Sequence, residues 1–237
     1  MVKNIHGENN EGGQCPPSCF NPDFAIEKAF IDRTEGLIAG ADEAGRGSLA
    51  GPLAVGLVIY PQSVIMEPAA ELLDHIRDSK QLSPQKRLRA RDIIRKWAIY
   101  SDVVMVSHRT IDAININRAT EFALNRIIQG ITDKLGVVLI DGNYSFDMPV
   151  PSVSVIKGDM KSVSIASASI MAKVRRDEVM ERMDSVYPGY GFSRHKGYGT
   201  ASHRQAIMDL GYSAVHRRSY EPVKSMAARR EEGPDED

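Results

Sequence analysis

Five short apolar runs constrain the fold of this chain more than any other feature. They are bounded mainly by glycine, proline and aspartate, and this pattern is typical of buried β-strands. We expect strands within 36–42, 51–60, 98–107, 135–142 and 151–159. The first two runs have no long helical pattern between them, which permits antiparallel pairing, whereas the fourth and fifth follow helical segments. The sequence therefore predicts an α/β domain with a mixed five-stranded sheet.

Helical patterns account for much of the remaining sequence. They lie within 83–98, 117–135, 162–186 and 201–211. Ser83 and Pro84 have the residue types of an N-cap and a first helical position, and Gly211 is a candidate C-cap. We expect these helices to lie around the sheet.

The length of 237 residues suggests one domain with appendages. Residues 1–34 are polar, then mildly helical, and predict a partly disordered N-terminal extension. The expected catalytic domain covers 35–226, and 227–237 form an acidic, disordered tail. The cysteines Cys15 and Cys19 are too few for a disulfide framework or a complete zinc site, so we expect ordinary thiols.

Targeting signals are not evident. No apolar run approaches the roughly 20 residues that span a bilayer, and the polar N-terminus lacks a secretory signal pattern. We therefore expect a cytoplasmic protein without a membrane partner. Nothing in the sequence indicates oligomerisation, so a monomer is the default.

Charge is distributed unevenly along the chain, although the net charge is only −1. The last seven residues carry five acids. A basic stretch includes Lys157, Lys161, Lys173, Arg175, Arg176, Arg194, Lys196, Arg204, Arg217, Arg218 and Lys224. Such an excess is expected of a protein that binds a phosphate backbone. Taken alone, however, it favours a solvated helix face beside a disordered tail.

Carboxylates recur where apolar runs end. Asp42 and Glu43 follow the first run, Asp141 ends the fourth, and Asp159 follows the fifth. If these strands are neighbours, the four acids converge on one rim and repel one another, which a divalent cation would relieve. All-oxygen ligands suit Mg²⁺ or Mn²⁺, and two such ions about 4 Å apart would form a clamp for phosphodiester hydrolysis.

Simpler explanations exist for each acid. A single strand-end aspartate is more often a turn or cap residue. Adjacent strand residues also face opposite sides, so Asp42 and Glu43 can share a site only if the strand ends or bends there. Gly45 and Gly47 make such a bend plausible.

Three loop motifs carry further candidates. Gly45, Arg46 and Gly47 leave backbone free to contact a ribose 2′-OH, or they form a tight turn with a solvated arginine. Ser79 and Lys80 precede a helix start and can bind phosphate or simply cap the helix. Tyr198 lies in "RHKGYGT", where basic and aromatic residues suit a nucleic-acid backbone as well as a solvated loop with a packed tyrosine.

Other polar residues outside these motifs have weaker claims. The segment "HRRSY", residues 216–220, is either a second phosphate contact or a basic loop. His75, His108 and His203 are expected to be structural rather than catalytic.

Taken together, these motifs resemble bacterial ribonuclease HII. The resemblance rests on "DEAGRGSLAGPL", "DSKQLS", "LIDGNY", "KGDMKSVSIASASIMAKVRRD" and "HKGYGT", in this order, and covers about residues 36–224. Gly-Arg-Gly after the acidic pair is similar to type HII, whereas type HIII has Gly-Lys-Gly. The N-terminal extension and the acidic tail lie outside the pattern.

The resemblance implies a ribonuclease H-like fold, a mixed five-stranded sheet flanked by helices and followed by a helical C-terminal portion. It also implies a ribonuclease H activity on RNA–DNA hybrids and on single ribonucleotides in duplex DNA. It implies that Asp42, Glu43, Asp141 and Asp159 are catalytic and bind two Mg²⁺ or Mn²⁺ ions, one to activate water and one to stabilise the leaving 3′-oxygen. The products would carry 5′-phosphate and 3′-hydroxyl ends.

The resemblance also implies substrate contacts. The Gly45–Gly47 loop would sense the 2′-OH, Tyr198 would pack on the deoxyribose after the ribonucleotide, and Ser79 and Lys80 would contact phosphate. Two rival functions remain: another nuclease of the same superfold, such as a junction resolvase or a hybrid-only ribonuclease H, and a non-catalytic hybrid-binding protein.

Overall fold

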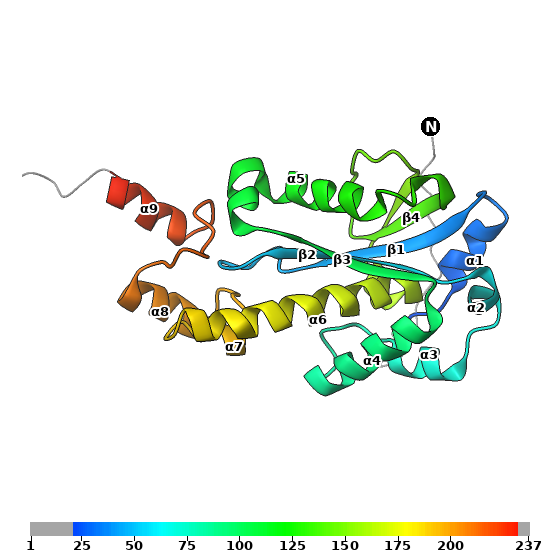
Figure 1. Cartoon of the computed structure of the whole chain (residues 1–237), viewed down its shortest axis with the longest axis horizontal. Coiled ribbons are helices and arrows are strands. Elements are labelled where there is room, and N and C mark those ends of the chain that lie inside the picture. Colours follow the sequence, from blue (N-terminus) through cyan, green and yellow to red (C-terminus); the bar gives the residue numbers. More distant parts are fainter. Residues whose placement is uncertain (1–20, 232–237) are drawn as a thin grey trace, which may run out of the picture.

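The computed structural model describes residues 21–231. Its centre is a single five-stranded sheet in the order β3-β2-β1-β4-β5 (Figure 1). The strands are β1 (Leu37–Ala44), β2 (Leu53–Ile59), β3 (Tyr100–Val106), β4 (Leu135–Asp141) and β5 (Ser152–Val155). β2 is antiparallel to β1 and β3, whereas β4 is parallel to β1 and β5. The predicted mixed sheet is confirmed, and only β1 extends beyond its predicted run.

Helices cover both faces of this sheet. α5 (His108–Ile128) lies on one face, and α6 (Val163–Val186) lies on the other with α4 (Pro84–Trp97) beside it (Figure 1). The other helices are α1 (Ala25–Ile31), α2 (Gln62–Met66), α3 (Ala70–His75), α7 (Phe192–His195), α8 (Ala201–Leu210), α9 (Val223–Glu231) and the short 3₁₀ helices η1 (Thr132–Lys134) and η2 (Gly158–Met160). α7, α8 and α9 form a helical C-terminal portion, and α9 extends into the predicted tail (227–237) as far as Glu231. None of the helices in the described part is long and apolar enough to cross a membrane.

Helix starts follow the capping residues in the sequence. The Ser83 side chain accepts a hydrogen bond from the Lys86 N–H, with Pro84 at the first helical position, as predicted. The helix predicted from residue 117 begins earlier, at His108, and contains a break at Asn115 (φ 65°, ψ 168°). The Asn115 side chain accepts from two backbone N–H groups there, so the predicted start corresponds to an internal cap.

The described part of the N-terminal extension packs against the domain. Phe24 is buried in the apolar cluster between the sheet and α6. Glu27 accepts hydrogen bonds from the Ser162 hydroxyl (2.6 Å) and the Ser164 N–H (2.9 Å) at the start of α6. α1 therefore helps to anchor the helix that follows Asp159. The predictions for Cys15, Cys19 and the acidic residues 232–237 lie outside the described residues.

Two glycines let α6 lie unusually close to the sheet. A Cβ placed on Gly40 of β1 would be 2.2 Å from the backbone carbonyl carbon of Ser164. A Cβ placed on Gly56 of β2 would be 2.4 Å from the carbonyl oxygen of Ala168. Since both obstacles are backbone atoms of one helix, a side chain at either glycine would push α6 away from β1, and β1 carries Asp42.

Gly40→Ala is therefore expected to destabilise the fold by about 3 kcal/mol, near the upper end of ordinary overpacking. The free energy of unfolding in urea measures the loss. Gly47→Ala is the matched control, because its added methyl meets no described atom within 4 Å. Equal stability of the two variants would contradict the close approach of α6.

Candidate active site

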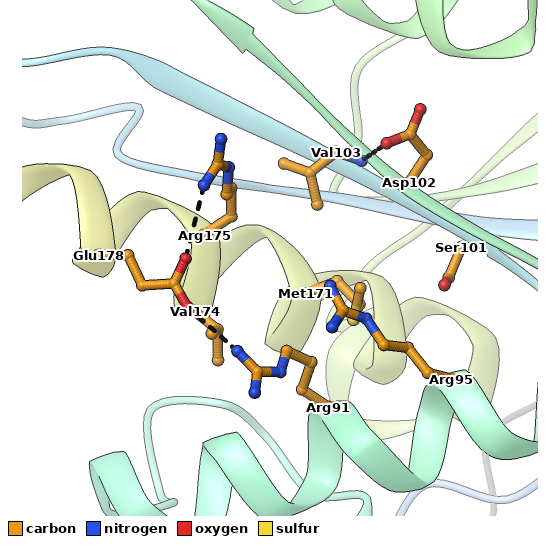
Figure 2. A pocket seen from close by; sticks show the side chains of 9 residues that line it. All are labelled: Arg91, Arg95, Ser101, Asp102, Val103, Met171, Val174, Arg175 and Glu178. Atoms are coloured by element: carbon orange, nitrogen blue, oxygen red, sulfur yellow. Dashed lines mark hydrogen bonds and ion pairs between the residues drawn. The ribbon is translucent and has the colours of Figure 1, made fainter.

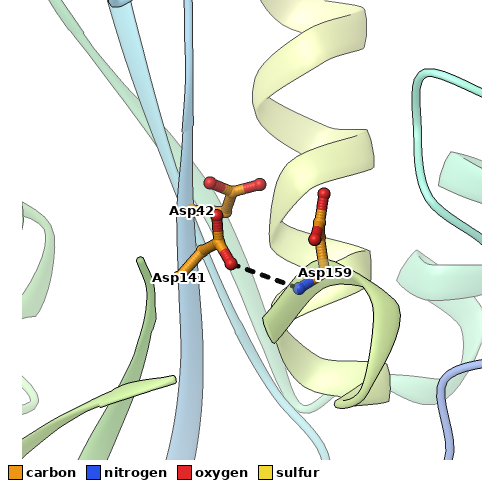
Figure 3. A group of neighbouring side chains, drawn as sticks. All are labelled: Asp42, Asp141 and Asp159. Carbon is orange, nitrogen blue, oxygen red and sulfur yellow. Dashed lines mark hydrogen bonds between the residues drawn. The ribbon is translucent and has the colours of Figure 1, made fainter. Parts of the chain in front are cut away.

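Three aspartates from different parts of the chain meet near the carboxyl ends of the neighbouring strands β1 and β4 (Figure 3). One carboxylate oxygen from each of Asp42, Asp141 and Asp159 lies within 4.8 Å of the others. Asp42 belongs to β1 and Asp141 is the last residue of β4, the parallel neighbour of β1. Asp159 follows β5 in η2. The predicted convergence of these three acids is thus present in the fold.

Backbone contacts hold the three aspartates in place. Asp141 Oδ1 accepts a hydrogen bond from the Gly158 N–H (2.6 Å) and a longer one from the Asp159 N–H (3.4 Å). These bonds tie η2 to the end of β4, as Figure 3 shows for Asp159. Asp42 Oδ1 accepts from the N–H of its own neighbour, Glu43, at 2.7 Å. The carboxylates are therefore positioned before any ligand binds.

Glu43 stands apart from this group. The expectation that the strand ends at the acidic pair is wrong, because β1 continues to Ala44 and stays paired with β2. Glu43 instead forms an ion pair with Arg46, 3.6 Å between Oε1 and Nη1. Burial and the nearby charge of Asp141 raise its pKa, and Arg46 and Lys80 partly offset the rise. Glu43 is thus coupled electrostatically to the site from its margin.

Burial and mutual repulsion raise the pKa values of the central carboxyls. The pKa of Asp42 rises well above its usual value because the group is buried, and the charges of Glu43 and Asp141 add to the effect. Burial and Asp141 also raise the pKa of Asp159, against the opposing effect of Lys80. Carboxylates forced together in this way are hard-oxygen ligands that favour a divalent cation such as Mg²⁺ or Mn²⁺. The residues present therefore fit the predicted metal.

Lys80 places a cation beside the carboxylates, a contact that the sequence did not predict. Its Nζ lies 3.3 Å from Asp159 Oδ2, although the side chain is 76% exposed. Partial burial alone would lower its pKa, but Asp159 and Asp78 outweigh this effect and raise it. Lys80 is therefore a charged, accessible group beside the carboxylates.

Ser79, by contrast, is buried. It is only 3% exposed, and its hydroxyl lies 2.9 Å from the hydroxyl of Ser169 on α6. Ser169 in turn hydrogen-bonds Asp42 and partly offsets the rise in its pKa. Ser79 thus lies behind the site rather than on its open surface.

The loop after β1 is held from inside the protein. Gly45 has a φ of +90°, and a Cβ there would lie 1.9 Å from Arg176 Nε. The carbonyl oxygens of Gly45 and Arg46 accept hydrogen bonds from Arg217 at 2.7 and 2.8 Å. The Arg46 side chain contacts Asn117 and Thr120 and lies over the Tyr144 ring, so it is not the solvated arginine of a simple turn.

Gly47 is the open part of this loop. It is exposed, and no described atom lies within 4 Å of where its Cβ would be. Within residues 21–231, the N–H groups of Arg46 and Gly47 donate to no protein acceptor. These two backbone donors are therefore without an acceptor in the described part of the chain, and one of them belongs to an exposed residue.

Tyr198 lies against the same loop. A β-bridge joins it to Ser48, the residue after Gly47. Tyr198 is 37% exposed, and its ring centroid lies near two cations, 5.6 Å from Lys173 Nζ and 5.3 Å from the Arg176 guanidinium carbon. An aromatic face, free backbone N–H groups and the carboxylates are thus linked through one short segment.

Arg176 and Arg217 are structural features that the sequence did not indicate. Both belong to the basic stretch for which the sequence predicts surface positions, yet both are fully buried. Arg176 donates to the carbonyls of Pro52, Lys196 and Ala50. Burial lowers its pKa to about 10. The phosphate contact considered for the segment 216–220 therefore cannot involve Arg217, and His216 is buried as well.

A separate pocket lies between α4, α6 and β3 (Figure 2). Its volume is about 130 Å³, small beside typical ligand sites of about 300–1,000 Å³. Glu178 bridges two of its arginines, at 3.1 Å from Arg91 and 3.6 Å from Arg175. None of its lining residues belongs to the carboxylate group, so the candidate active site remains at Asp42, Asp141 and Asp159.

Comparison with known proteins assigns this arrangement to a family. The family model described as Ribonuclease HII matches residues 39–223. The chain belongs to the ribonuclease HII family. It is 42% identical to the ribonuclease HII of Caldicellulosiruptor saccharolyticus over 197 residues, which cover 83% of this chain and 93% of that relative. As a ribonuclease HII it is a ribonuclease H, a hydrolase.

Solved ribonuclease H structures share its fold. The ribonuclease HII in the PCNA:RNase HII complex from Archaeoglobus fulgidus superposes with a TM-score of 0.64 at 26% identity, over 78% of this chain and 95% of that one. Bst-RNase HIII in complex with Mn²⁺ gives a TM-score of 0.60 at 17% identity, over 84% of this chain and 71% of that one. The ribonuclease H-like fold predicted for this ribonuclease HII is therefore confirmed.

Proposed function

We propose that this ribonuclease HII hydrolyses the RNA strand of RNA–DNA hybrids and nicks duplex DNA on the 5′ side of a single embedded ribonucleotide. The products carry 5′-phosphate and 3′-hydroxyl ends. The observation that carries the proposal is the convergence of Asp42, Asp141 and Asp159 beside a loop with free backbone donors. Such a site can cut a phosphodiester bond and read the sugar next to it.

The carboxylates are the proposed metal ligands. Asp42, Asp141 and Asp159 would hold the ions, with Glu43 contributing from the margin. Two bound Mg²⁺ or Mn²⁺ ions would supply an activated water and stabilise the leaving 3′-oxygen. The Mn²⁺ complex of Bst-RNase HIII, a protein with this fold, supports Mn²⁺ as a candidate. Ser169 and Ser79 support Asp42 from behind.

The remaining groups are proposed to bind the substrate. Lys80 is charged, exposed and next to Asp159, so it can contact a backbone phosphate. The N–H groups of Arg46 and Gly47 can donate to a ribose 2′-OH, and this hydroxyl distinguishes RNA from DNA. The exposed Tyr198 ring can pack on the adjacent deoxyribose. Together these contacts would select the junction between RNA and DNA.

Mapping one cut tests this function. A labelled DNA duplex with one ribonucleotide is incubated with Mg²⁺ or Mn²⁺ beside an all-DNA duplex, a uniform hybrid and a four-way junction. We expect a single nick 5′ to the ribonucleotide and no cleavage of the all-DNA duplex. Cleavage of the uniform hybrid alone would instead indicate a hybrid-only ribonuclease H. Binding to the hybrid without turnover in Mn²⁺ would indicate a non-catalytic protein.

Metal binding is expected to stabilise the protein. Divalent ions relieve repulsion among carboxyls whose pKa values are raised in the metal-free protein. At a metal concentration 100 times the Kd, the gain is about 2.7 kcal/mol by mass action. The melting temperature with and without Mn²⁺, measured at constant ionic strength, checks this. A melting temperature that stays constant up to saturating Mn²⁺ would contradict the metal assignment.

A further inference from the structure

Two buried histidines lie beneath Tyr198, outside the carboxylate site. His203 on α8 is fully buried, and His216 is only 2% exposed. Their Nε2 atoms are 3.1 Å apart. The Phe192 ring packs on both imidazoles, at centroid distances of 5.4 and 5.7 Å. The proposed chemistry uses neither histidine.

The hydrogen bonds of this pair fix both tautomers. The Ser213 N–H lies 2.9 Å from His216 Nδ1, and because a backbone N–H only donates, Nδ1 is an acceptor. A neutral His216 therefore carries its proton on Nε2 and donates it to His203 Nε2. His203 must then carry its proton on Nδ1, which donates to the carbonyl oxygen of Tyr198 at 2.9 Å.

Both rings are neutral at physiological pH. Burial lowers the pKa of His203 to about 4, and the pKa of His216 is also lowered to about 4 by burial and by its neighbour His203. The pair is therefore a directed chain of hydrogen bonds from Ser213 to Tyr198. An apolar pair would fill the same volume without needing any polar partner. The directed chain ends at the backbone of Tyr198, the residue proposed to pack on the deoxyribose.

The same segment also holds the loop after β1. Arg217 follows His216, and its N–H donates to the Leu49 carbonyl at 2.8 Å. Its guanidinium donates to the carbonyls of Gly45 and Arg46, and a β-bridge joins His216 to Ala50. Residues 213–217 thus contact the loop directly through Arg217 and are connected to Tyr198 through the hydrogen bond between His216 and His203.

We propose that His203 and His216 are positioning residues that set the place of Tyr198 relative to the Gly45–Gly47 loop, and hence the preference for an RNA–DNA junction. The inference rests on the proposed function. It assigns the histidine pair no contact with substrate. Its effect is on selectivity, because the cleaved strand of a uniform hybrid has no deoxyribose for Tyr198 to pack on. In a DNA strand with a single ribonucleotide, a deoxyribose follows that ribonucleotide.

Two substitutions at one position separate positioning from stability. An asparagine amide can replace Nδ1 of histidine, so His203→Asn keeps a donor for the Tyr198 carbonyl and loses the bond to His216. A glutamine amide can replace Nε2, so His203→Gln keeps the bond to His216 and loses the bond to Tyr198. Each variant loses one of the two hydrogen bonds, and we expect similar decreases in melting temperature.

The readout is the ratio of kcat/KM on the single-ribonucleotide duplex to kcat/KM on the uniform hybrid. We expect His203→Gln to lower this ratio about tenfold, as misplacement of a substrate contact does, and His203→Asn to stay near wild type. Equal ratios for both variants and wild type would show a merely structural pair and overturn the inference. A wild-type protein that does not nick at the single ribonucleotide would overturn the proposed function, and the inference with it.

A further variant covers the case in which His203→Gln does not fold. His216→Asn keeps the acceptor for Ser213 and withdraws the donor from His203 Nε2. It should lower the same ratio, because the His203 proton can then move from Nδ1 to Nε2, which leaves no donor for the Tyr198 carbonyl. The amide in His203→Asn has no such alternative and stays a donor without His216. An unchanged ratio in a folded His216→Asn variant would likewise overturn the inference.

Discussion

Asp42→Asn is expected to reduce cleavage on the order of 10³-fold or more while the protein stays folded. Asp42 is 7% exposed, and its burial, together with the charges of Glu43 and Asp141, raises its pKa. The amide has nearly the same shape but no charge, so it is a much weaker ligand for a divalent ion. Initial rates on the uniform hybrid and on the single-ribonucleotide duplex, in Mg²⁺ and in Mn²⁺, measure the loss.

The same substitution should not weaken the metal-free protein. A carboxyl whose folded-state pKa is raised destabilises the fold once the pH rises above its unfolded-state pKa. At neutral pH the asparagine avoids this cost, so the melting temperature without metal should equal or exceed that of wild type. The rise in melting temperature on adding Mn²⁺ should shrink or vanish.

Asp102→Asn is a suitable control for the charge change. Asp102 lies exposed on β3 and accepts a hydrogen bond from the Val103 N–H, which asparagine can also accept. Its activity should remain near wild type. Normal cleavage by Asp42→Asn would remove Asp42 from the reaction, and a variant that unfolds without metal would contradict the repulsion argument.

Local sequence patterns predicted most of the sheet and three of the acids. A strand and the polar residue that ends it are adjacent in sequence, so Asp141 could be placed at the end of β4 from the sequence alone. The position of Asp42 was harder to judge. β1 loses its partner β4 after the pair Ala41–Ile140, yet it continues along β2, and no local pattern distinguishes this from a strand end.

Contacts between distant residues could not be predicted in the same way. Lys80 reaches Asp159 across 79 positions, and nothing near either residue indicates the pair. Arg217 looks like a surface cation in a basic segment, but it is buried because the loop after β1 turns its carbonyl oxygens inward. Charge is visible in a sequence, whereas the backbone acceptors that allow it to be buried arise only in the fold.

Gly47→Ala is expected to leave the fold intact and to reduce nicking at a single ribonucleotide about 100-fold, the effect of displacing a substrate by roughly 1 Å. The added methyl meets no described atom within 4 Å, so the free protein should accept it with little change in the free energy of unfolding. In the complex, the methyl would occupy the open side of the loop, beside the N–H groups of Arg46 and Gly47 that we propose as donors to the ribose 2′-OH. Melting temperature and initial nicking rate are measured together.

Gly45→Ala provides the contrast, two positions earlier. There a Cβ would lie 1.9 Å from Arg176 Nε, and the alanine would have to adopt a φ of +90°. This variant should lose stability as well as activity, because the buried arginine would have to move. Normal nicking by a folded Gly47→Ala variant would exclude the loop backbone from ribose recognition. The opposite result is that Gly47→Ala loses nicking at unchanged stability, whereas Gly45→Ala also loses stability. The added methyl would then act on the complex at Gly47 and on the fold at Gly45. This result would place the substrate on the open side of the loop.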